Sequence, residues 1–299
     1  MDRYMPKKVL ARTLTGQVIL SLDTCTGDWV ALKRNVISPT TEETFSVEKR
    51  VHETLSNNCG HQHVLRLRDT FVSDGYDHIV MDYCKNGDLF EMVSAAGSLD
   101  TALAKRYFGQ VASAVAFMHG RGFAHRDLSL ENVLLDDQRN CHLCDFGLAT
   151  KASGARTDFV GKPFYIAPEI VARCTYDPVK ADMWSLGVML FMMLSGAPLC
   201  ELASPKDARY EYFTNHGLRA LIQTWNMSHR FDAEALELLE MMLDPNPKTR
   251  ARMAQVLVHP YITGRRLQQR EARQQKSAPR TFMRRWIDML PQRAIKLVF

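Results

Sequence analysis

Long apolar runs are absent from this sequence of 299 residues. The N-terminal segment, MDRYMPKK, lacks the apolar stretch of a signal peptide. The most apolar segment, Met183 to Leu194, is too short to span a bilayer and is typical of a buried helix. We therefore expect a protein with no transmembrane segment.

Cysteine is also sparse, with seven residues scattered along the chain. An odd number without a short disulfide framework is typical of a reducing compartment, so we expect a cytoplasmic or nuclear protein. One Cys-x-x-Cys spacing, at Cys141 and Cys144, suggests a redox or zinc motif. No second pair accompanies it, and its alternation fits strand packing better.

Acidic residues are scarce at the C-terminal end. Residues 264–299 hold ten Lys or Arg against two acids, a balance of +8, so a net charge of +5 leaves −3 for residues 1–263. This basic tail carries apolar residues at helical spacing, Phe282, Trp286, Met289 and Leu290. It can bind an acidic surface, a calmodulin-like groove or a membrane face, or dock on its own acidic core as an inhibitory segment. A solvated extension is the plain alternative, and no nucleic-acid motif exists beyond charge.

The stretch from His125 to Gly147 carries the clearest chemistry. Asp127 is followed by Asn132 and, after two short apolar runs separated by a polar turn, by Asp145. The two runs predict a hairpin, which brings Asn132 and Asp145 face to face. An amide oxygen and a carboxylate that converge can bind Mg²⁺ alongside phosphates, and Asp127, just outside, is placed to receive a proton.

These residues resemble the catalytic core of the eukaryotic protein kinases, whose H-R-D-L-x-x-x-N loop and D-F-G triplet are both present. The resemblance implies that Asp127 accepts the substrate proton, while Asn132 and Asp145 hold Mg²⁺ and the substrate nucleotide is ATP. It also implies an α+β, two-lobed fold. We expect a small antiparallel sheet lobe with one helix at residues 1–83, a larger, mainly helical lobe at 84–263, and the basic tail at 264–299.

The resemblance is weakest in the first turn, where the family has G-x-G-x-x-G-x-V. Three strands are expected between Val9 and Lys33, but only Gly16 of the glycines remains. Cβ atoms at the other two positions restrict the approach of the backbone to phosphate, so we expect weaker phosphate binding and a raised KM for ATP. The expected nucleotide-binding segment is Leu10, Ala11, Arg12, Thr13, Leu14, Thr15, Gly16, Gln17 and Val18.

A lysine is expected at the α- and β-phosphates. Val30-Ala31-Leu32-Lys33 matches the family's V-A-I-K strand, which assigns this role to Lys33 and places Ala31 beside the nucleotide. The next segment, from Phe45 to Leu55, has a helical pattern with two candidate carboxylates for this lysine. By resemblance we choose Glu48 over Glu53, which is expected to be a solvated charge.

A hinge between the lobes is expected after two further strands, at 64–71 and 78–83. The resemblance assigns the backbone of Asp82 and Cys84 to adenine, Met81 to the back of the pocket or to simple core packing, and Asp88 to the ribose. Leu134 and Cys144 complete the expected nucleotide pocket.

Farther along, the family pattern pairs Glu169 of Ala-Pro-Glu with Arg250, and places Asp182 beneath the catalytic loop.

Two departures from the family pattern concern the catalytic charge. Ser129 stands where the Ser/Thr-directed relatives carry Lys, and Lys162 stands where they carry Thr. The two groups are thus exchanged across Asp127. Phosphoryl transfer needs positive charge near the γ-phosphate, and our hypothesis is that Lys162 supplies it. The rival interpretation is a decayed active site.

A third departure concerns the segment after Asp-Phe-Gly. Asp158 lies where many relatives carry a phosphorylated threonine that pairs with the loop arginine, here Arg126. A carboxylate carries about half the charge of a phosphate, so it would hold the segment partly ordered without modification. The alternative is an ordinary solvated acid.

The acceptor is expected to be serine or threonine, because the loops typical of tyrosine-directed kinases are absent. Glu131 and Asp88 weakly favour a basic residue before the acceptor, and the layout loosely resembles the calcium/calmodulin-dependent group. The expected function is transfer of the γ-phosphoryl group of MgATP to protein Ser/Thr, with Asp127 as base. The alternative is a pseudokinase or nucleotide-binding scaffold with little turnover.

Overall fold

The computed structural model describes residues 3–13, 15–38 and 42–264. The chain divides into two units, Met1–Ile262 and Thr263–Phe299. Leu14 and, apart from Gly264, the basic tail lie outside the described residues, so the predictions made for them stay predictions.

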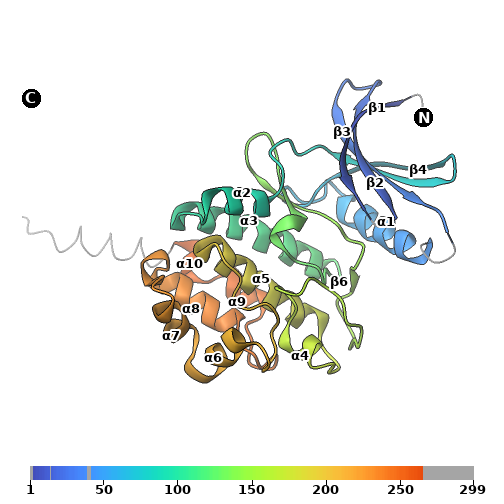
Figure 1. Ribbon diagram of the computed structural model, residues 1–299. Coiled ribbons are helices and arrows are strands. Elements are labelled where there is room, and N and C mark those ends of the chain that lie inside the picture. The colour runs from blue at the N-terminus through green and yellow to red at the C-terminus, as the bar shows by residue number, and fades with distance from the viewer. Residues whose placement is uncertain (1–2, 14, 39–41, 265–299) are drawn as a thin grey trace, which may run out of the picture. The chain divides into compact units, whose positions relative to one another are not determined.

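Five antiparallel strands form the sheet of the first unit, in the order β1-β2-β3-β5-β4 (Figure 1). The strands are β1 (Tyr4–Arg12), β2 (Gly16–Asp23), β3 (Trp29–Val36), β4 (Leu67–Ser73) and β5 (Tyr76–Asp82). The helix α1 (Glu42–Ser56) lies between β3 and β4 in the chain and contacts β4. The predicted lobe boundary at residues 83 and 84 falls just after β5.

The alternation of side chains in β3 divides the core of this sheet in two. Val30 and Leu32 pack on one face, with Tyr4 and Ile19. Ala31 packs on the opposite face, and Lys33 shares that face because successive side chains of a strand alternate. The sheet therefore presents Ala31 and Lys33 on the same side.

The helix-rich part of the unit is built around α5 (Pro178–Ser195), in which every residue from Ala181 to Ser195 is buried. Asp177 caps its N-terminus, and the apolar segment predicted as a buried helix lies inside it. The long helix α3 (Thr101–Gly120) is capped at its N-terminus by Asp100. The remaining helices are α2 (Leu89–Ala96), α4 (Pro168–Val171), α6 (Ala208–His216), α7 (Leu218–Thr224), α8 (Ala233–Met242), α9 (Met253–Leu257) and α10 (Pro260–Thr263).

Short strands frame the stretch from His125 to Gly147. The predicted hairpin is present as β7 (Val133–Leu135) and β8 (Cys141–Leu143), which pair antiparallel. Phe123–Ala124 (β6) pairs with Thr150–Lys151 (β9), so both ends of the stretch are tied together. A 3₁₀ turn, η1 (Leu130–Asn132), leads into β7.

The boundaries predicted for the sheet strands were partly wrong. β1 begins at Tyr4 rather than Val9, β4 begins at Leu67 rather than Val64, and β5 begins at Tyr76 and ends at Asp82. The early start of β1 was missed because it is an edge strand, exposed along almost its whole length, without an apolar alternation. Its pairing with β2 is also shifted at two places, between Pro6 and Lys8 and between Val9 and Ala11.

Among the described residues, none of the helices combines the length and the apolarity needed to cross a membrane.

Candidate active site

The β7–β8 hairpin brings Asn132 and Asp145 together, as the sequence predicted. The N–H of Cys144 donates to the Asn132 carbonyl at 3.0 Å, so Asp145 follows directly on a residue bonded to Asn132. The backbone of Asp145 has a φ of 60°, which is uncommon for a residue with a side chain. This turn directs the chain away from the hairpin immediately after β8.

The side chains of Asp127 and Asn132 are bonded to each other. The Asn132 amide nitrogen donates to the Asp127 carboxylate at 2.8 Å and to the Asp127 backbone carbonyl at 2.7 Å. Both amide hydrogens are thus used on Asp127, and within the described residues the amide oxygen accepts no hydrogen bond. That oxygen and the half-exposed carboxylate of Asp145 are the hard ligands that Mg²⁺ accepts.

The described residues offer only part of the ligands that a metal ion needs. In the described residues no group of three or more His, Cys, Asp and Glu side chains is arranged to hold a metal ion. Mg²⁺ commonly binds one or two protein oxygens and takes its other ligands from phosphates and water. Asn132 and Asp145 therefore fit an ion that arrives with a nucleotide, rather than a metal held by the protein alone.

Lys33 lies between two carboxylates. Its Nζ donates to Glu48 Oε1 at 2.6 Å and to Asp145 Oδ1 at 3.4 Å. Burial alone would lower the pKa of Lys33, but the attraction of Glu48 and Asp145 outweighs it and raises the pKa. The contact with Glu48 confirms the choice made from the sequence, and the rejected candidate, Glu53, is exposed.

The two aspartates have opposite electrostatic surroundings. Burial raises the pKa of Asp127, although Lys162 and the Asn132 amide act in the other direction. Burial also acts to raise the pKa of Asp145, but Lys33, His125 and the Gly147 N–H together hold it below its usual value. Asp127 is therefore the better proton acceptor, and Asp145 the more persistent anion.

The backbone beneath Asp127 is held by Asp182, as predicted. The two oxygens of this fully buried carboxylate accept from the N–H groups of His125 and Arg126, both at 2.8 Å. His119 adds a third contact to Asp182 at 2.8 Å. These bonds support Arg126 in a left-handed conformation with a φ of 65°.

Glu169 and Arg250 form the predicted ion pair. The guanidinium donates to both carboxylate oxygens, at 2.7 and 2.8 Å, and both side chains are buried. Arg250 also donates to the carbonyls of Asp244 and Lys180. This pair attaches the end of the segment after Asp145 to the helix-rich part of the unit.

The exchanged pair, Lys162 and Ser129, meets beside Asp127. Lys162 Nζ donates to Ser129 Oγ at 2.7 Å, and the Ser129 side chain is buried. Asp127 and Lys162 line the same small cavity. The sequence predicted the exchange of residue types, and the structure adds that the two side chains are bonded to each other.

Glu131 was expected to face a basic residue of the substrate, but it already has partners. The Tyr165 hydroxyl donates to Glu131 Oε2 at 3.1 Å, and Lys162 Nζ lies 3.9 Å from the same oxygen. Asp88 is engaged too, because its side chain caps α2 by accepting from the Glu91 N–H at 2.8 Å. These contacts leave less of either carboxylate available to a substrate.

Asp158 contacts Arg126, as the third departure predicted. Arg126 donates to the Asp158 carboxylate and, through Nε, to the Leu148 carbonyl at 2.8 Å. The Asp158 side chain is 52% exposed, whereas that of Arg126 is 11% exposed. The carboxylate thus reaches from the surface to a mostly buried cation, and it is not simply a solvated acid.

Six of the side chains predicted to line the nucleotide pocket belong to one apolar cluster: Val18, Ala31, Met81, Cys84, Leu134 and Cys144. The cluster joins the sheet to the β7–β8 hairpin. It also contains Leu65, Leu67 and Ile79, which were not predicted. Their signal was present in the sequence, because they lie in the apolar alternation of the strands around β4 and β5.

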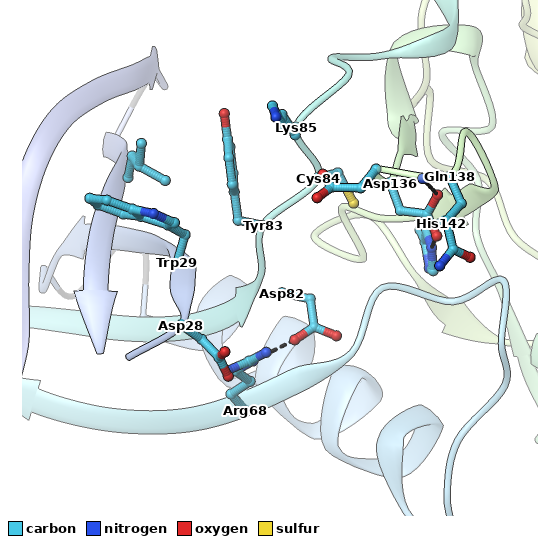
Figure 2. Close-up of a pocket in the computed structure, with 12 residues that line it drawn as sticks. Asp28, Trp29, Arg68, Asp82, Tyr83, Cys84, Lys85, Asp136, Gln138 and His142 are labelled. Carbon is cyan, nitrogen blue, oxygen red and sulfur yellow. Dashed lines mark hydrogen bonds and ion pairs between the residues drawn. The ribbon is translucent and has the colours of Figure 1, made fainter. Parts of the chain in front are cut away.

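The hinge segment beside this cluster lies along a pocket of about 570 Å³ (Figure 2). Trp29 and Tyr83 line one side of the pocket, and Asp82 is bonded to Arg68 at its base. Lys33, Asp127 and Asp145 do not line it, so it is separate from the catalytic groups. Among the described residues, neither the N–H nor the C=O of Cys84 makes a hydrogen bond, which leaves a backbone donor and acceptor for a ligand such as adenine.

At Gly16, where the turn between β1 and β2 ends, the structure leaves no room for a side chain. A Cβ at Gly16 would lie 1.9 Å from the Arg34 carbonyl oxygen, so close pairing of β2 with β3 requires glycine here. The residues Leu10, Ala11, Arg12 and Thr13 are exposed, whereas Thr15, Gln17 and Val18 are half-buried. The structure gives no reason to revise the expected weak phosphate binding.

The Cys-x-x-Cys pair packs in two different clusters. Cys141 belongs to the main core and Cys144 to the apolar cluster of the sheet. Burial raises the pKa of both thiols, so neither is a thiolate nucleophile. Packing thus accounts for both cysteines.

One residue near the site had no signal in the sequence. His52, one turn after Glu48 on α1, is buried and its ring packs edge-on against Phe146, with centroids 5.0 Å apart. Its Nε2 lies 2.7 Å from the Leu65 carbonyl. Burial lowers the pKa of His52 to about 4, so it is neutral at ordinary pH. A lone histidine on a helix gives no indication of such contacts.

Comparison with known proteins supports the resemblance. Residues 4–262 match the model of the protein kinase domain. The chain is 34% identical over 276 residues to CBL-interacting protein kinase 30 of Oryza sativa subsp. japonica, with 88% of this chain and 54% of the relative covered. It is 33% identical over 276 residues to CBL-interacting serine/threonine-protein kinase 13 of Arabidopsis thaliana, with 88% and 51% covered. The chain thus spans about half the length of these relatives.

Proposed function

The chain belongs to the protein kinase domain family, and on this basis we propose that it is a protein serine/threonine kinase. The reaction is transfer of the γ-phosphoryl group of ATP to a hydroxyl of a protein substrate. The observation that carries the proposal is the gathering of two bonded pairs at one place. Lys33 donates to Asp145, Asn132 donates to Asp127, and the backbone bond from Cys144, next to Asp145, to Asn132 brings the two pairs together. The comparisons support the same activity, because the relatives are named as kinases.

Asp127 is proposed as the catalytic base. Its carboxylate orients the acceptor hydroxyl and receives its proton as the oxygen attacks phosphorus. The Asn132 amide fixes the carboxylate from one side by a hydrogen bond. Asp182 fixes the backbone of the residues that directly precede Asp127. The raised pKa of Asp127 favours this role, since a more basic carboxylate takes up a proton more readily.

Lys33 is proposed to hold the α- and β-phosphates, with Glu48 fixing its position. The ammonium is aimed by two carboxylates within 3.4 Å, so it is preorganised before a nucleotide binds. Asn132 and Asp145 are proposed to hold Mg²⁺, which when bound neutralises charge on the phosphates. The apolar cluster from Val18 to Cys144 is proposed to take the adenine, with Cys84 and Asp82 offering backbone groups and Asp88 near the ribose.

Lys162 is proposed to supply the positive charge beside the transferred group. Burial raises the pKa of Asp127, and the Lys162 ammonium lies close enough to oppose that rise. Its bond to Ser129 holds it at the catalytic loop. In the transition state, negative charge is spread over the oxygens of the transferred phosphoryl group. A fixed cation beside these oxygens stabilises the transition state. No feature of the described residues favours the scaffold alternative.

The proposal extends to the partners and the location of the protein. A protein with a Ser or Thr acceptor is the proposed substrate, and the basic tail at 264–299 is proposed to dock on an acidic partner or on its own kinase domain. The names of the relatives state that those proteins interact with CBL, which makes a protein partner reasonable here as well. We also propose a cytoplasmic or nuclear location, since all seven cysteines are free.

A two-step experiment tests the proposed activity. A thermal shift with ATP and Mg²⁺ measures nucleotide binding, and a phosphorylation assay on a basic protein with Ser and Thr residues measures turnover. Wild type should bind and transfer phosphate, whereas Asp127→Asn should still bind but lose transfer. Binding without any transfer by wild type would contradict the proposal and favour a scaffold.

A further inference from the structure

The pocket beside the hinge segment combines aromatic rings with carboxylates. Its volume of about 570 Å³ lies within the range of ligand-binding pockets. Trp29 and Tyr83 line one side, and Asp136 of the β7–β8 turn lies across from them (Figure 2). These residues come from β3, the hinge segment and the β7–β8 turn, so the fold brings them together from three parts of the chain.

Trp29 is exposed at the start of β3. The residue is 45% exposed, and among the described residues its ring makes no hydrogen bond, ring contact or contact with a cation. Side chains alternate along a strand, so Trp29 shares the face of Ala31 and lies one step beyond the apolar cluster. A tryptophan at the edge of a cavity offers a large contact area to a partner, and such residues often dominate binding.

Tyr83 adds a second ring to the same cavity. It is half-buried, and its hydroxyl makes no hydrogen bond within the described part of the chain. The faces of tyrosine and tryptophan rings attract cations, and the planar guanidinium of arginine also stacks on them. The two rings therefore favour a cationic group with a flat face.

Acidic side chains outnumber basic ones around the pocket. Its charged lining consists of Asp28, Asp82, Asp136, Asp137, Arg68 and Lys85, a balance of −2 with His142 counted as neutral. Arg68 donates to Asp28 at 2.8 Å and also to Asp82, so one cation serves two carboxylates. The lining as a whole attracts positive charge.

The two aspartates of the β7–β8 turn differ in their contacts. Asp136 is engaged, because it accepts from the N–H groups of Gln138 and Asn140 and lies 3.2 Å from His142 Nε2. Asp137 is exposed and makes no hydrogen bond or ion pair with any described residue. Its carboxylate is therefore available to a cation from outside the chain.

From these observations, and resting on the proposed function, we propose that the pocket binds a basic segment of the protein substrate. An arginine of that segment stacks on Trp29 and Tyr83, and a second cation pairs with Asp137. Asp127 does not line the pocket, so the docked segment and the phosphorylated residue are different parts of the substrate. The negative lining disfavours an acidic segment or a nucleic acid.

Docking of this kind has a definite kinetic signature. The contacts lie away from the reacting groups, so they stabilise the bound substrate and the transition state equally. They lower the KM for the protein substrate and leave kcat unchanged. A docked segment also raises the effective concentration of the acceptor at the catalytic loop. A substrate without the basic segment gains nothing from the pocket.

Binding is measured first, on the full chain and without any need for activity. The probe is a fluorescein-labelled hexa-arginine peptide followed by fluorescence anisotropy, with a labelled hexaglutamate peptide as the opposite charge. Wild type should bind only the arginine peptide. Trp29→Ala should weaken this binding about tenfold or more, and Asp137→Lys about threefold or more.

Two controls match these variants. Val72→Ala removes another exposed apolar side chain from the same sheet, and Glu201→Lys reverses a charge that does not line the pocket. Both should bind the arginine peptide as wild type does. Thermal melts report whether each variant is folded. If Trp29→Ala did not fold, the comparison of Asp137→Lys with Glu201→Lys would decide.

Kinetics test the link to the substrate. Two peptides share one serine-containing acceptor sequence, and one of them continues through a flexible Gly-Ser linker into an arginine-rich segment. Wild type should have a KM about fivefold or more lower for the extended peptide, with the same kcat. Trp29→Ala should remove this difference and leave the kinetics of the short peptide unchanged.

Separate results would overturn the docking site and the proposed function. Equal affinity of wild type and folded Trp29→Ala for the arginine peptide, or binding of hexaglutamate as tight as that of hexa-arginine, would overturn the docking site. An extended peptide with no advantage in KM would overturn it as well. If the arginine peptide bound through Trp29 and Asp137 but no peptide or protein were phosphorylated, the proposed function would fail and the basic-segment site would stand.

Discussion

The ammonium of Lys162 donates to the hydroxyl of Ser129 at 2.7 Å, beside Asp127, the residue proposed as the catalytic base. The family pattern of the Ser/Thr-directed kinases, as the resemblance implies it, has the two groups in the opposite order. The contact means that the exchange of residue types keeps one cation and one hydroxyl at the same place. Exchanging the residues at positions 129 and 162 together therefore keeps the local charge, whereas changing either position alone alters it.

The first prediction concerns Lys162 itself. Lys162→Ala should lower kcat by ~10²-fold, because it removes a donor that acts in the transition state. The KM for ATP should change little. Steady-state phosphorylation kinetics measure both values, with Lys206→Ala as an exposed control that should behave as wild type. A fall in kcat below about threefold would contradict the role given to Lys162.

The second prediction concerns the pH dependence of the reaction. Asp127 must be deprotonated to accept a proton, so kcat should fall as the pH drops through its raised pKa. The positive charge of Lys162 acts to lower that pKa, and Lys162→Ala should therefore move the acidic limb of the profile to higher pH. Profiles of kcat against pH for wild type and variant test this. An acidic limb that stays in place, or moves to lower pH, would contradict the proposed effect of the Lys162 charge on the pKa of Asp127.

The third prediction concerns activation. Because Asp158 already pairs with Arg126, the enzyme should be active before any phosphorylation of the segment. Protein produced in bacteria and treated with phosphatase should keep most of its activity. Loss of activity on this treatment would show that a phosphate is needed and would point to Thr157 or Ser153.

The fourth prediction concerns acid stability through His52. Burial lowers the pKa of His52 to about 4 in the folded state, whereas an unfolded histidine titrates at about 6.5. The unfolded state thus binds the proton first as the pH falls, and the folded state loses stability below about pH 6.5. Between pH 7 and pH 5 the loss due to this residue should be about 2 kcal/mol.

Urea unfolding of wild type and His52→Leu at the two pH values measures that loss. Leucine does not titrate, so the variant should lose less stability over the same interval. Identical losses in the two proteins would mean that His52 is already protonated in the folded state, or is not buried.

The fifth prediction concerns the Glu169–Arg250 pair. Glu169→Gln leaves the buried Arg250 without its counter-ion, which should cost about 3 kcal/mol or more and lower Tm by roughly 6–12 °C. The matched control is Glu240→Gln, which breaks an exposed pair with Arg219 and should cost less than about 1 kcal/mol. Equal shifts in a thermal melt would argue against a structural role for the buried pair.

The sequence predicted several contacts among the proposed catalytic groups, because these contacts depend mostly on local structure. Asn132 and Asp145 meet through a hairpin of a few residues, and Glu48 lies on a helix whose apolar face is plain from its spacing. The contact of Asp182 with His125 joins distant residues, and it was found only through the family resemblance. Spacing alone could not have given it.

Other features depend on packing that no local pattern records. The bond between Tyr165 and Glu131 joins a residue of an irregular segment to one in the 3₁₀ turn η1, so neither side chain predicts the other. The start of β1 at Tyr4 was missed for a related reason. Its strand is paired on one side only, and the aromatic contact between Tyr4 and Phe71 that holds it is between residues far apart in the chain.

The exposed position of β1 has a further consequence for the behaviour of the molecule at high concentration. An edge strand offers unpaired N–H and C=O groups on which a second chain could add a strand of its own. Here Pro6 has no N–H to offer, and Lys7 and Lys8 would place like charges beside an identical neighbour. The irregular pairing at Pro6 and Lys8 also distorts this border. Self-association through this border is disfavoured, and the sheet ends at five strands.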